Sequence, residues 1–251
     1  SGSEDSSVAA IEVDGKILID SGVSVANVPS IASTVRANPS AGFSIVSYSG
    51  SSSAVTVGHG LNAAPEMIII KDRDSGVYNW QVAHIGIGAD DSLLLNSANA
   101  KADYNAWNNT RPTSTVFSLG AGILGVNTNG NNMIAYCFAP VEGYSAMGSY
   151  TGNGSADGPF VFTGFKISWL MVKSSSNSGE HWLILDAARD SYNVADATIY
   201  ANLTNAESEA SVLGIDILSN GFKPRGTNAG TNASGYTYIY VAFAEHPFKT
   251  A

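Results

Sequence analysis

An internal duplication dominates this sequence of 251 residues. Four segments recur in the same order: residues 48–50 at 150–152, 67–71 at 169–173, 80–84 at 182–186 and 133–139 at 238–244. The first three pairs are 102 residues apart and the fourth pair is 105 residues apart. Ordered matches at a nearly constant spacing predict two copies of one structural unit, with the small drift taken up in loops. We therefore expect the two halves to superpose strand for strand, with Trp80 and Trp182 in equivalent places.

Each copy has the pattern of β-structure. Short apolar runs rich in Val, Ile, Tyr and Phe alternate with turn pairs such as Asn129-Gly130 and Asn220-Gly221. Residues 133–139 are apolar on both alternating sides, which predicts a central strand. The stretch 187–210, rich in Ala, Asp and Glu, leaves room for one short helix.

We therefore predict an all-β fold of two tandem, similar antiparallel β-sandwich repeats of jelly-roll or lectin-like type. The predicted boundaries are 1–41 for an N-terminal hairpin and extended linker, 42–142 for repeat 1 and 143–251 for repeat 2. A single fused jelly-roll-like sandwich built from both repeats is the alternative. Residues 11–19 carry the hairpin, with Asp14-Gly15 as its two-residue turn. A lone hairpin is marginal in water, so we expect it to pack on another copy or on a preceding domain.

The charge balance excludes several partners. Charged residues make up 13% of the chain, and 12 basic against 21 acidic residues give a net charge of −9. This argues against nucleic acid and against an anionic membrane surface, since both need clustered Lys and Arg. No apolar run approaches the ~20 residues of a membrane-spanning helix. Cys137 stands alone, which excludes an internal disulfide, and its apolar neighbours predict a buried, inert thiol.

The sequence offers no catalytic motif, and we predict neither enzyme activity nor a cofactor. Residues 120–125 spell GxGxxG, but a turn signal follows them where a nucleotide site needs a helix. Asp72 and Asp74 are weak candidates for a Ca²⁺ site, because their loop lacks the further oxygen ligands and is ordinary turn chemistry. His84 aligns with Asp186 in the other copy, which predicts a polar rim position.

Aromatic residues that break the repeat are the candidate ligand contacts. Trp80 and Trp182 are present in both copies, which favours a core role. The predicted site comprises five residues: Tyr78, Tyr104, Trp107, Asn108 and Arg111. An aromatic face can stack on a sugar ring while amide and guanidinium groups bond its hydroxyls. The second copy places residues 205–209, without any aromatic, in roughly the corresponding region. A loop merely held onto the sandwich by its aromatics is the equal alternative.

Four strings resemble a known phage family. They are AAIEVDGKILIDSGV, WNNTRPTSTVFSLG, GSYTGNGSADGPFVFTGF and YIYVAFAEHPFKTA. They resemble a duplicated domain of poorly defined function near the C-terminus of fibre-like virion proteins of tailed bacteriophages, notably marine and cyanobacterial ones. The resemblance covers residues 42–251, with the hairpin as a typical upstream linker. It implies a place on the virion, at the extracellular face of a tail fibre, and it supplies no catalytic residues.

These observations lead to one expected function and two rivals. The expected function is a non-enzymatic adhesion domain that binds a host cell-surface polysaccharide. The rivals are a purely structural module that trimerises or caps a fibre, and a glycan-degrading, tailspike-like enzyme. The expected partners are the polysaccharide, other fibre or virion proteins and further copies in a homotrimer, without nucleic acid or membrane insertion. Binding predicts exposed aromatics, a structural role predicts them at a subunit interface, and an enzyme predicts two acids in a cleft.

Overall fold

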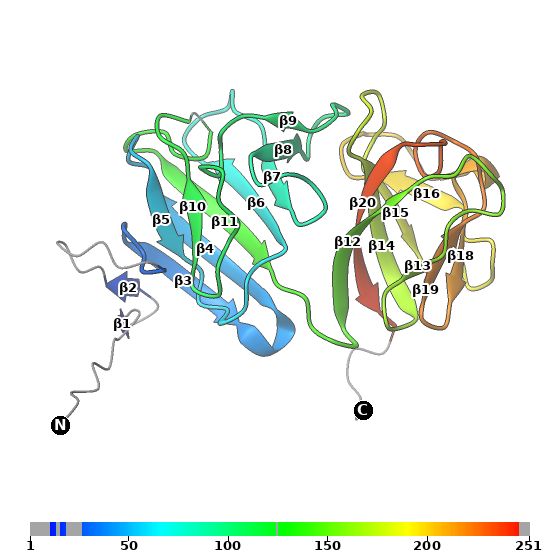
Figure 1. The fold of residues 1–251 in the computed structure, drawn as a ribbon, viewed down its shortest axis with the longest axis horizontal. Coiled ribbons are helices and arrows are strands. Elements are labelled where there is room, and N and C mark those ends of the chain that lie inside the picture. The colour runs from blue at the N-terminus through cyan, green and yellow to red at the C-terminus, as the bar shows by residue number, and fades with distance from the viewer. Residues whose placement is uncertain (1–10, 14–15, 19–26, 124, 246–251) are drawn as a thin grey trace. The chain divides into compact units, whose positions relative to one another are not determined.

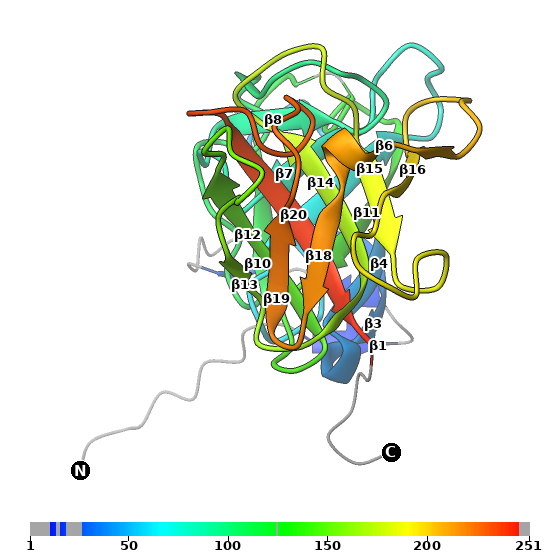
Figure 2. The same ribbon diagram turned by 90° about the vertical axis from the view of Figure 1, so that its right-hand side faces the viewer.

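The computed structural model describes residues 11–13, 16–18, 27–123 and 125–245 (Figures 1 and 2). Over these residues the chain forms twenty strands and two 3-10 helices, η1 (Pro39–Ala41) and η2 (Ser211–Leu213). The strands pair in antiparallel ladders, which confirms the all-β class. The prediction of a short helix within 187–210 was wrong. That stretch forms turns and the strands β16 (Ala197–Tyr200) and β17 (Ser208–Glu209), which pair with each other.

Contacts divide the chain into two compact units. Unit 1 comprises Ser1–Tyr78 and Asn105–Ala139, and unit 2 comprises Asn79–Tyr104 and Pro140–Ala251. Residues 79–104 precede the second repeat in the sequence but belong to unit 2 by their contacts. Each unit is therefore built around one repeat, but unit 2 also takes up a segment of the other.

Unit 1 has one large sheet and one small sheet. The large sheet runs β1 (Ile11–Val13), β2 (Lys16–Leu18), β3 (Ser33–Asn38), β4 (Phe43–Ser49), β11 (Asn132–Phe138) and β6 (Met67–Asp72). The small sheet pairs β5 (Val55–Gly58) with β10 (Val116–Leu119). β1 and β2 pair as predicted, whereas their turn at 14–15 and their side chains lie outside the described part. β11 lies between β4 and β6, which confirms a central strand. Cys137 on β11 is buried, and burial raises the pKa of its thiol to about 12, as expected of an inert thiol.

Unit 2 has a similar large sheet and a small sheet that share one core. The large sheet runs β12 (Ser145–Thr151), β20 (Thr237–Ala244), β14 (Ile167–Ser174), β15 (Leu183–Asp186), β16 and β17. The small sheet runs β13 (Val161–Phe162), β19 (Gly221–Pro224) and β18 (Ile215–Leu218). A further ladder joins β7 (Gln81–His84), β8 (Asp91–Leu94) and β9 (Ala102–Asp103). Leu170 and Tyr238 from the large sheet and Phe222 from the small sheet belong to the shared core.

The strand registers repeat at the offsets that the sequence predicted. Tyr48 faces Met133 in the β4–β11 ladder, and Tyr150 faces Tyr238 in the β12–β20 ladder. The same holds one strand further, where Asp72 on β6 faces Met133 and Ser174 on β14 faces Tyr238. The duplication is therefore confirmed in the pairing of these six strands.

The two matched tryptophans also take equivalent places. The backbone N–H of Trp80 donates to Asn96 Oδ1, and that of Trp182 donates to Asn202 Oδ1, both at 3.1 Å. Trp80 precedes β7 and Trp182 precedes β15. Trp182 is buried and Trp80 is half-buried, so the core role holds fully for Trp182.

A buried asparagine closes the end of each copy. Asn127 is fully buried in unit 1. Its Oδ1 accepts a hydrogen bond from Ser51 N at 2.9 Å, and its Nδ2 donates to Ser53 O at 2.7 Å and Gly120 O at 2.9 Å. Because every polar atom of this amide has a backbone partner, the side chain ties three loop segments together.

Asn232 makes the same set of bonds in unit 2. It is fully buried, accepts from Asn153 N at 3.0 Å and donates to Ser155 O at 2.7 Å and Gly226 O at 2.9 Å. A third and longer contact of Asn232 Nδ2 reaches Asn153 Oδ1 at 3.1 Å. We call Asn127 and Asn232, with their backbone partners, the asparagine clamps. Sequence reasoning missed them, although the two asparagines are themselves 105 residues apart, the offset of the matched segments 133–139 and 238–244.

Candidate functional site

The structure separates the five residues of the predicted site. Trp107, Asn108 and Arg111 lie in one loop of unit 1, and Tyr104 belongs to unit 2. Asn108 and Arg111 are exposed, Tyr104 is 38% exposed, and Tyr78 is half-buried against Gly125. Asn108 adopts a left-handed conformation, with φ of 51°. Tyr104, Asn108 and Arg111 therefore keep accessible polar or aromatic groups.

Trp107 is a core residue, which corrects its place in the predicted site. Its side chain is 3% exposed, so the ring offers no face to a ligand. The turn that carries it is equivalent to η2: Asn108 N approaches Asn105 O, and Gly214 N bonds Ser211 O in the same pattern. By this correspondence Trp107 is the equivalent of the buried Leu213 in the other copy. It does not correspond to residues 205–209, as the sequence suggested. Trp107, although its neighbours in the sequence are polar, thus holds its loop in place by packing into the core.

Asp72 and Asp74 organise a turn. Asp72 is buried, and its Oδ1 accepts from Asp74 N at 2.9 Å and Ser75 N at 3.0 Å. Burial opposes its ionisation, but these bonds and one from Asn131 hold the pKa of Asp72 below its usual value. Asp74 Oδ2 accepts from Asn132 N at 2.7 Å. Within the described part of the chain, no group of three or more His, Cys, Asp or Glu side chains could hold a metal ion.

His84 is buried, so the expected rim position was wrong. Its Nδ1 accepts from Gly86 N at 3.0 Å, and its Nε2 lies 3.1 Å from Tyr240 O. Asp186 in the other copy accepts from Ala188 N at 3.1 Å, which is the equivalent bond. The position takes His or Asp because both can cap the same turn, and this does not require exposure.

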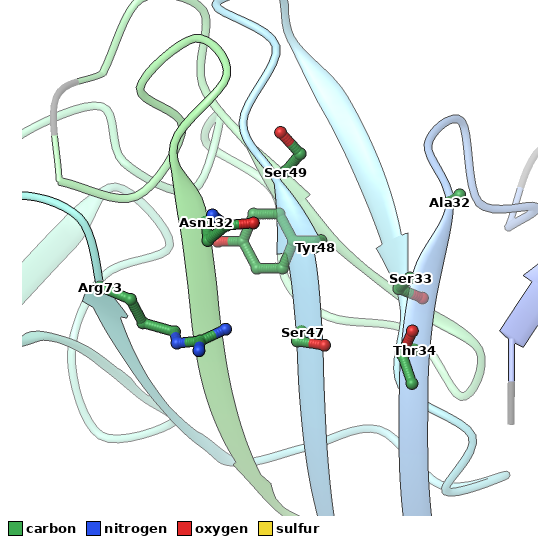
Figure 3. Close-up of a pocket in the computed structure, with 8 residues that line it drawn as sticks. All are labelled: Ala32, Ser33, Thr34, Ser47, Tyr48, Ser49, Arg73 and Asn132. Carbon is green, nitrogen blue, oxygen red and sulfur yellow. The ribbon is translucent and has the colours of Figure 1, made fainter.

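A polar pocket of about 220 Å³ lies on the outer side of the large sheet of unit 1 (Figure 3). Its lining comes from β3, β4 and β11 and from the residue that follows β6. The lining residues are Ala32, Ser33, Thr34, Ser47, Tyr48, Ser49, Arg73 and Asn132. They supply hydroxyl, amide and guanidinium groups but no carboxylate. The pair of acids that glycan hydrolysis needs is therefore not part of this lining.

Two exposed phenylalanines, two residues apart in the sequence, lie at the start of β13 in the small sheet of unit 2. Phe160 is 50% exposed and Phe162 is 63% exposed, whereas Val161 between them points into the core. A Cβ built on Gly221 would lie 3.1 Å from the ring of Phe160, and one on Gly164 would lie 3.8 Å from that of Phe162. We call Phe160 and Phe162 the phenylalanine platform. Two exposed rings at and beside one strand make this a candidate binding surface.

Charged groups lie on the same small sheet as the platform. Lys223 on β19 pairs with Asp157 at 2.5 Å, and Arg225 reaches Asp157 and Asp216, each at 3.4 Å. Lys223 follows the core residue Phe222, so its side chain projects outward, to the face that also carries Phe162. A flat aromatic surface thus has hydrogen-bonding groups beside it.

The platform breaks the repeat. Phe222 faces Val161 in unit 2 as Phe117 faces Val57 in unit 1, so Phe160 corresponds to Thr56. Thr56 is held by the linker, since its N–H donates to Ser30 Oγ at 2.7 Å. Unit 1 therefore has no aromatic at this place, and the platform is particular to the second copy.

Comparison with known families places the chain. A family model described as a domain of unknown function, DUF7483, matches residues 19–247. The chain belongs to the DUF7483 family. A search of curated proteins and a search of solved structures found no match to it. In the described portion of this DUF7483 chain, no helix has the length and apolar character needed to cross a membrane.

One buried histidine of this DUF7483 domain makes its stability depend on pH. His59 in unit 1 is fully buried; its Nδ1 accepts from Leu61 N at 3.3 Å, and its Nε2 donates to Thr113 O at 3.1 Å. Burial lowers the pKa of His59 to about 4. The unfolded chain, with a histidine pKa of ~6.5, binds more protons below that pH than the folded chain does.

We therefore expect the free energy of unfolding of unit 1 to fall as the pH drops from 7 to 5, by about 2 kcal/mol from this group. Urea unfolding at the two pH values, followed by tryptophan fluorescence, measures the change. His59→Gln should reduce the pH dependence, and His181→Gln is the control that should keep it. An unchanged slope in the His59 variant would contradict the assignment.

Proposed function

We propose that this DUF7483 domain is a non-enzymatic adhesion domain of a tailed-phage fibre that binds a glycan of the host cell surface. The observation that carries the proposal is the phenylalanine platform. The face of an exposed ring can stack on the apolar face of a sugar, and the charged groups beside it can bond the sugar hydroxyls. The resemblance to fibre-like virion proteins supports the same reading and gives the extracellular face of the virion as its location.

We further propose that each repeat is an antiparallel sandwich of jelly-roll or lectin-like type, arranged in tandem. The equal registers of β4–β11–β6 and β12–β20–β14 support this, and so does the core that the two sheets of unit 2 share. Such a scaffold tolerates substitutions at its edges, whereas the asparagine clamps make equivalent hydrogen bonds in both copies. The platform is a change of this kind.

The exposed residues of the site predicted from sequence remain further candidate contacts in the proposal, Tyr104 in unit 2 and, separately, Asn108 and Arg111 in unit 1. Tyr104, Asn108 and Arg111 keep accessible polar or aromatic groups. The glycan-degrading rival has less support, because the polar pocket of unit 1 has no acid in its lining.

Phe162→Ala is expected to weaken glycan binding about fivefold or more, because stacking on one aromatic contributes about 1 kcal/mol or more. The free energy of unfolding should change by less than about 0.5 kcal/mol, since the ring is mainly exposed. A glycan array of bacterial surface polysaccharides, read with the full chain, measures the binding.

Tyr192→Ala is the matched control, because Tyr192 is 88% exposed in unit 2 and lies outside the platform. Binding that survives in the double variant Phe160→Ala/Phe162→Ala would remove the platform from the proposal. Loss of binding in Tyr104→Ala alone would move the site to the loop predicted from the sequence.

A further inference from the structure

Equivalent sheet faces of the two units differ in how they are covered. We define the open face as the outward side of β4, β11 and β6 in unit 1. Its apolar side chains are Phe43, Ile45, Met67, Ile69, Ile134, Tyr136 and Phe138. Met67 is 2% exposed, Ile45 is 37% exposed and the others are half-buried. The matching face of unit 2 is buried: Met147, which corresponds to Ile45, is 7% exposed. Ile239 and Val241, which correspond to Ile134 and Tyr136, are also buried.

Residues 79–104 supply the cover in unit 2. A Cβ built on Gly86 would lie 2.8 Å from Ser149 Cβ and 3.0 Å from Ile239 Cγ2, so the turn rests directly on the sheet. His84 Nε2 lies 3.1 Å from Tyr240 O on the central strand. We call β7, β8 and the turn 84–88 the first edge. Its inward residues are fully buried, as Val82 illustrates.

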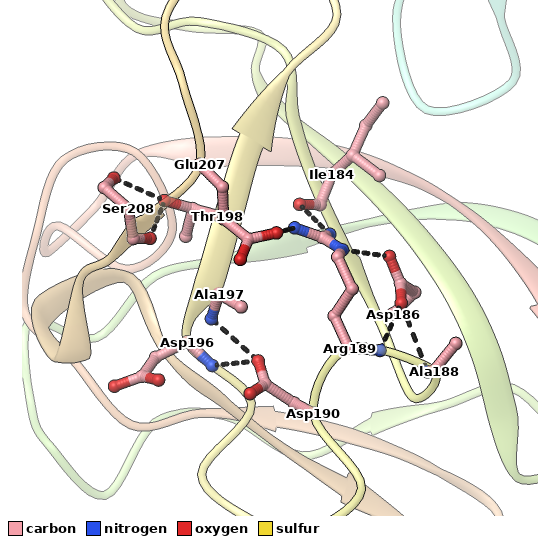
Figure 4. Close-up of polar contacts among 10 residues, drawn as sticks. All are labelled: Ile184, Asp186, Ala188, Arg189, Asp190, Asp196, Ala197, Thr198, Glu207 and Ser208. Atoms are coloured by element: carbon pink, nitrogen blue, oxygen red, sulfur yellow. Dashed lines mark hydrogen bonds and ion pairs between the residues drawn. The ribbon is translucent and has the colours of Figure 1, made fainter.

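The second repeat carries an edge of the same construction. Gln81 faces Leu94 in the β7–β8 ladder, and Leu183 faces Tyr200 in the β15–β16 ladder. Asp186 caps the turn in the place of His84, as the hydrogen bonds to Ala188 N and Arg189 N show (Figure 4). We call β15, β16 and the turn 186–190 the second edge.

The second edge has no comparable cover within unit 2. Ile184, the counterpart of the buried Val82, is half-buried, and Ala188, the counterpart of Gly86, is exposed. Arg189 folds back onto Asp186 at 2.7 Å and Glu207 at 2.8 Å (Figure 4). In the chain, the first edge thus covers the sheet face of unit 2. The open face of unit 1 and the second edge are surfaces of the same type that remain uncovered.

We propose that the open face of one copy of this chain receives the second edge of another copy. The covered face of unit 2 is the template for the contact. In that template the turn rests on Ser149 and Ile239, whose counterparts in unit 1 are Ser47 and Ile134. Ala188 carries a Cβ where Gly86 has none, so the turn of the incoming copy would lie somewhat further from Ser47 than Gly86 lies from Ser149, beside the polar pocket of Figure 3.

The charges of the two surfaces complement each other. The open face carries Arg36, Lys71 and Arg73, with Asp74 as the exposed acid beside them. The second edge, the strand β17 next to it and the residues directly before β16 and β17 carry one arginine among five acids, which are Asp186, Asp190, Asp196, Glu207 and Glu209. Opposite charge at the rim of an apolar contact steers two copies into one orientation. This favours a second copy over an unrelated apolar partner.

Such a contact joins two different surfaces. Every copy can therefore bind one neighbour through its open face and another through its second edge. Contacts of this kind form a closed ring when the rotation closes and a filament when it does not. The homotrimer expected for a fibre protein is one closed form. The platform residues, Phe160 directly before β13 and Phe162 on it, lie outside both surfaces, so this inference does not depend on the proposed function.

Two substitutions test the contact on the full chain. Ile45→Arg places a charge in the open face, and Ala188→Arg enlarges the tip of the second edge. We expect light scattering to give the wild type a mass that is a multiple of 26.0 kDa and each variant a mass of 26.0 kDa. An equal mixture of the two variants should form a complex of two chains and no larger species, since one intact face and one intact edge remain. Val77→Arg, at an exposed position of unit 1, should keep the wild-type mass.

Three results would overturn the proposal. They are a wild type that stays at 26.0 kDa at every concentration reached, assembly that survives Ala188→Arg, and a mixture that fails to pair. If circular dichroism shows that either variant does not fold, Ser49→Arg and Glu207→Arg replace them, because both positions are exposed. Assembly that survives Ile45→Arg or Ser49→Arg would equally exclude the open face.

Discussion

Trp107→Ala is expected to lower the free energy of unfolding of unit 1 by about 3–5 kcal/mol, the usual cost of deleting a buried tryptophan. The ring is 3% exposed, and its counterpart in the other copy is the buried Leu213. Removing it takes a large apolar area out of the core and leaves a cavity that the rigid sheets cannot close. Urea unfolding followed by circular dichroism measures the change.

Tyr104→Ala is the matched control for this prediction, because Tyr104 is an aromatic nearby in the sequence that is 38% exposed. It should cost less than about 1 kcal/mol, as partly exposed positions do. Leu213→Ala should repeat the large effect in unit 2, by about 2–5 kcal/mol. A Trp107 variant of unchanged stability that loses glycan binding would return this residue to the ligand site.

Asn232→Ala is the second large effect, with an expected loss of at least about 3 kcal/mol. The substitution removes the side-chain partner of the buried Gly226 O and of the partly buried Asn153 N and Ser155 O. Each unsatisfied buried group costs about 1–3 kcal/mol. Asn127→Ala should have the same effect on unit 1, because its amide makes the equivalent bonds.

Asn232→Asp sharpens this test, because it keeps the size of the side chain and removes only the amide donor. Its carboxylate would face two carbonyl oxygens, so we expect it to be at least as damaging as alanine near neutral pH. Asn99→Ala, at an exposed position of unit 2, should change the stability by less than about 0.5 kcal/mol. Thermal denaturation of the three variants ranks them, and equal melting curves for Asn232→Ala and Asn99→Ala would refute the role of the clamp.

The class of fold and the duplication could be predicted because both depend on patterns within short segments of the sequence. Alternating apolar runs fix strands, and ordered matches such as Tyr48 with Tyr150 fix the equivalence of strands. The sequence could not show that residues 79–104 belong to unit 2, because that depends on which sheet face lies against them. It could not show the clamps either, since one buried Asn looks like any other Asn in a chain rich in this residue.

The site was harder to predict because exposure is not a local property. Trp107 has polar neighbours in the sequence, yet the turn directs its ring inward. Phe160 and Phe162 alternate with Val161, and when both faces of a strand are apolar the pattern does not tell which face is outside. His84 was placed at a rim because Asp186 occupies the equivalent position, but turn capping explains that exchange equally well.

The split composition of unit 2 sets an order for the folding of a chain during its synthesis. The first edge, with Val82 and Ile87, is complete on the ribosome before any strand of the sheet that buries it has been made. That sheet stays open until the last strand, because β20 lies between β12 and β14. A nascent chain that stops before Thr237 therefore exposes two unpaired strand edges and an apolar turn, which is the state in which chains of this kind aggregate or need a chaperone.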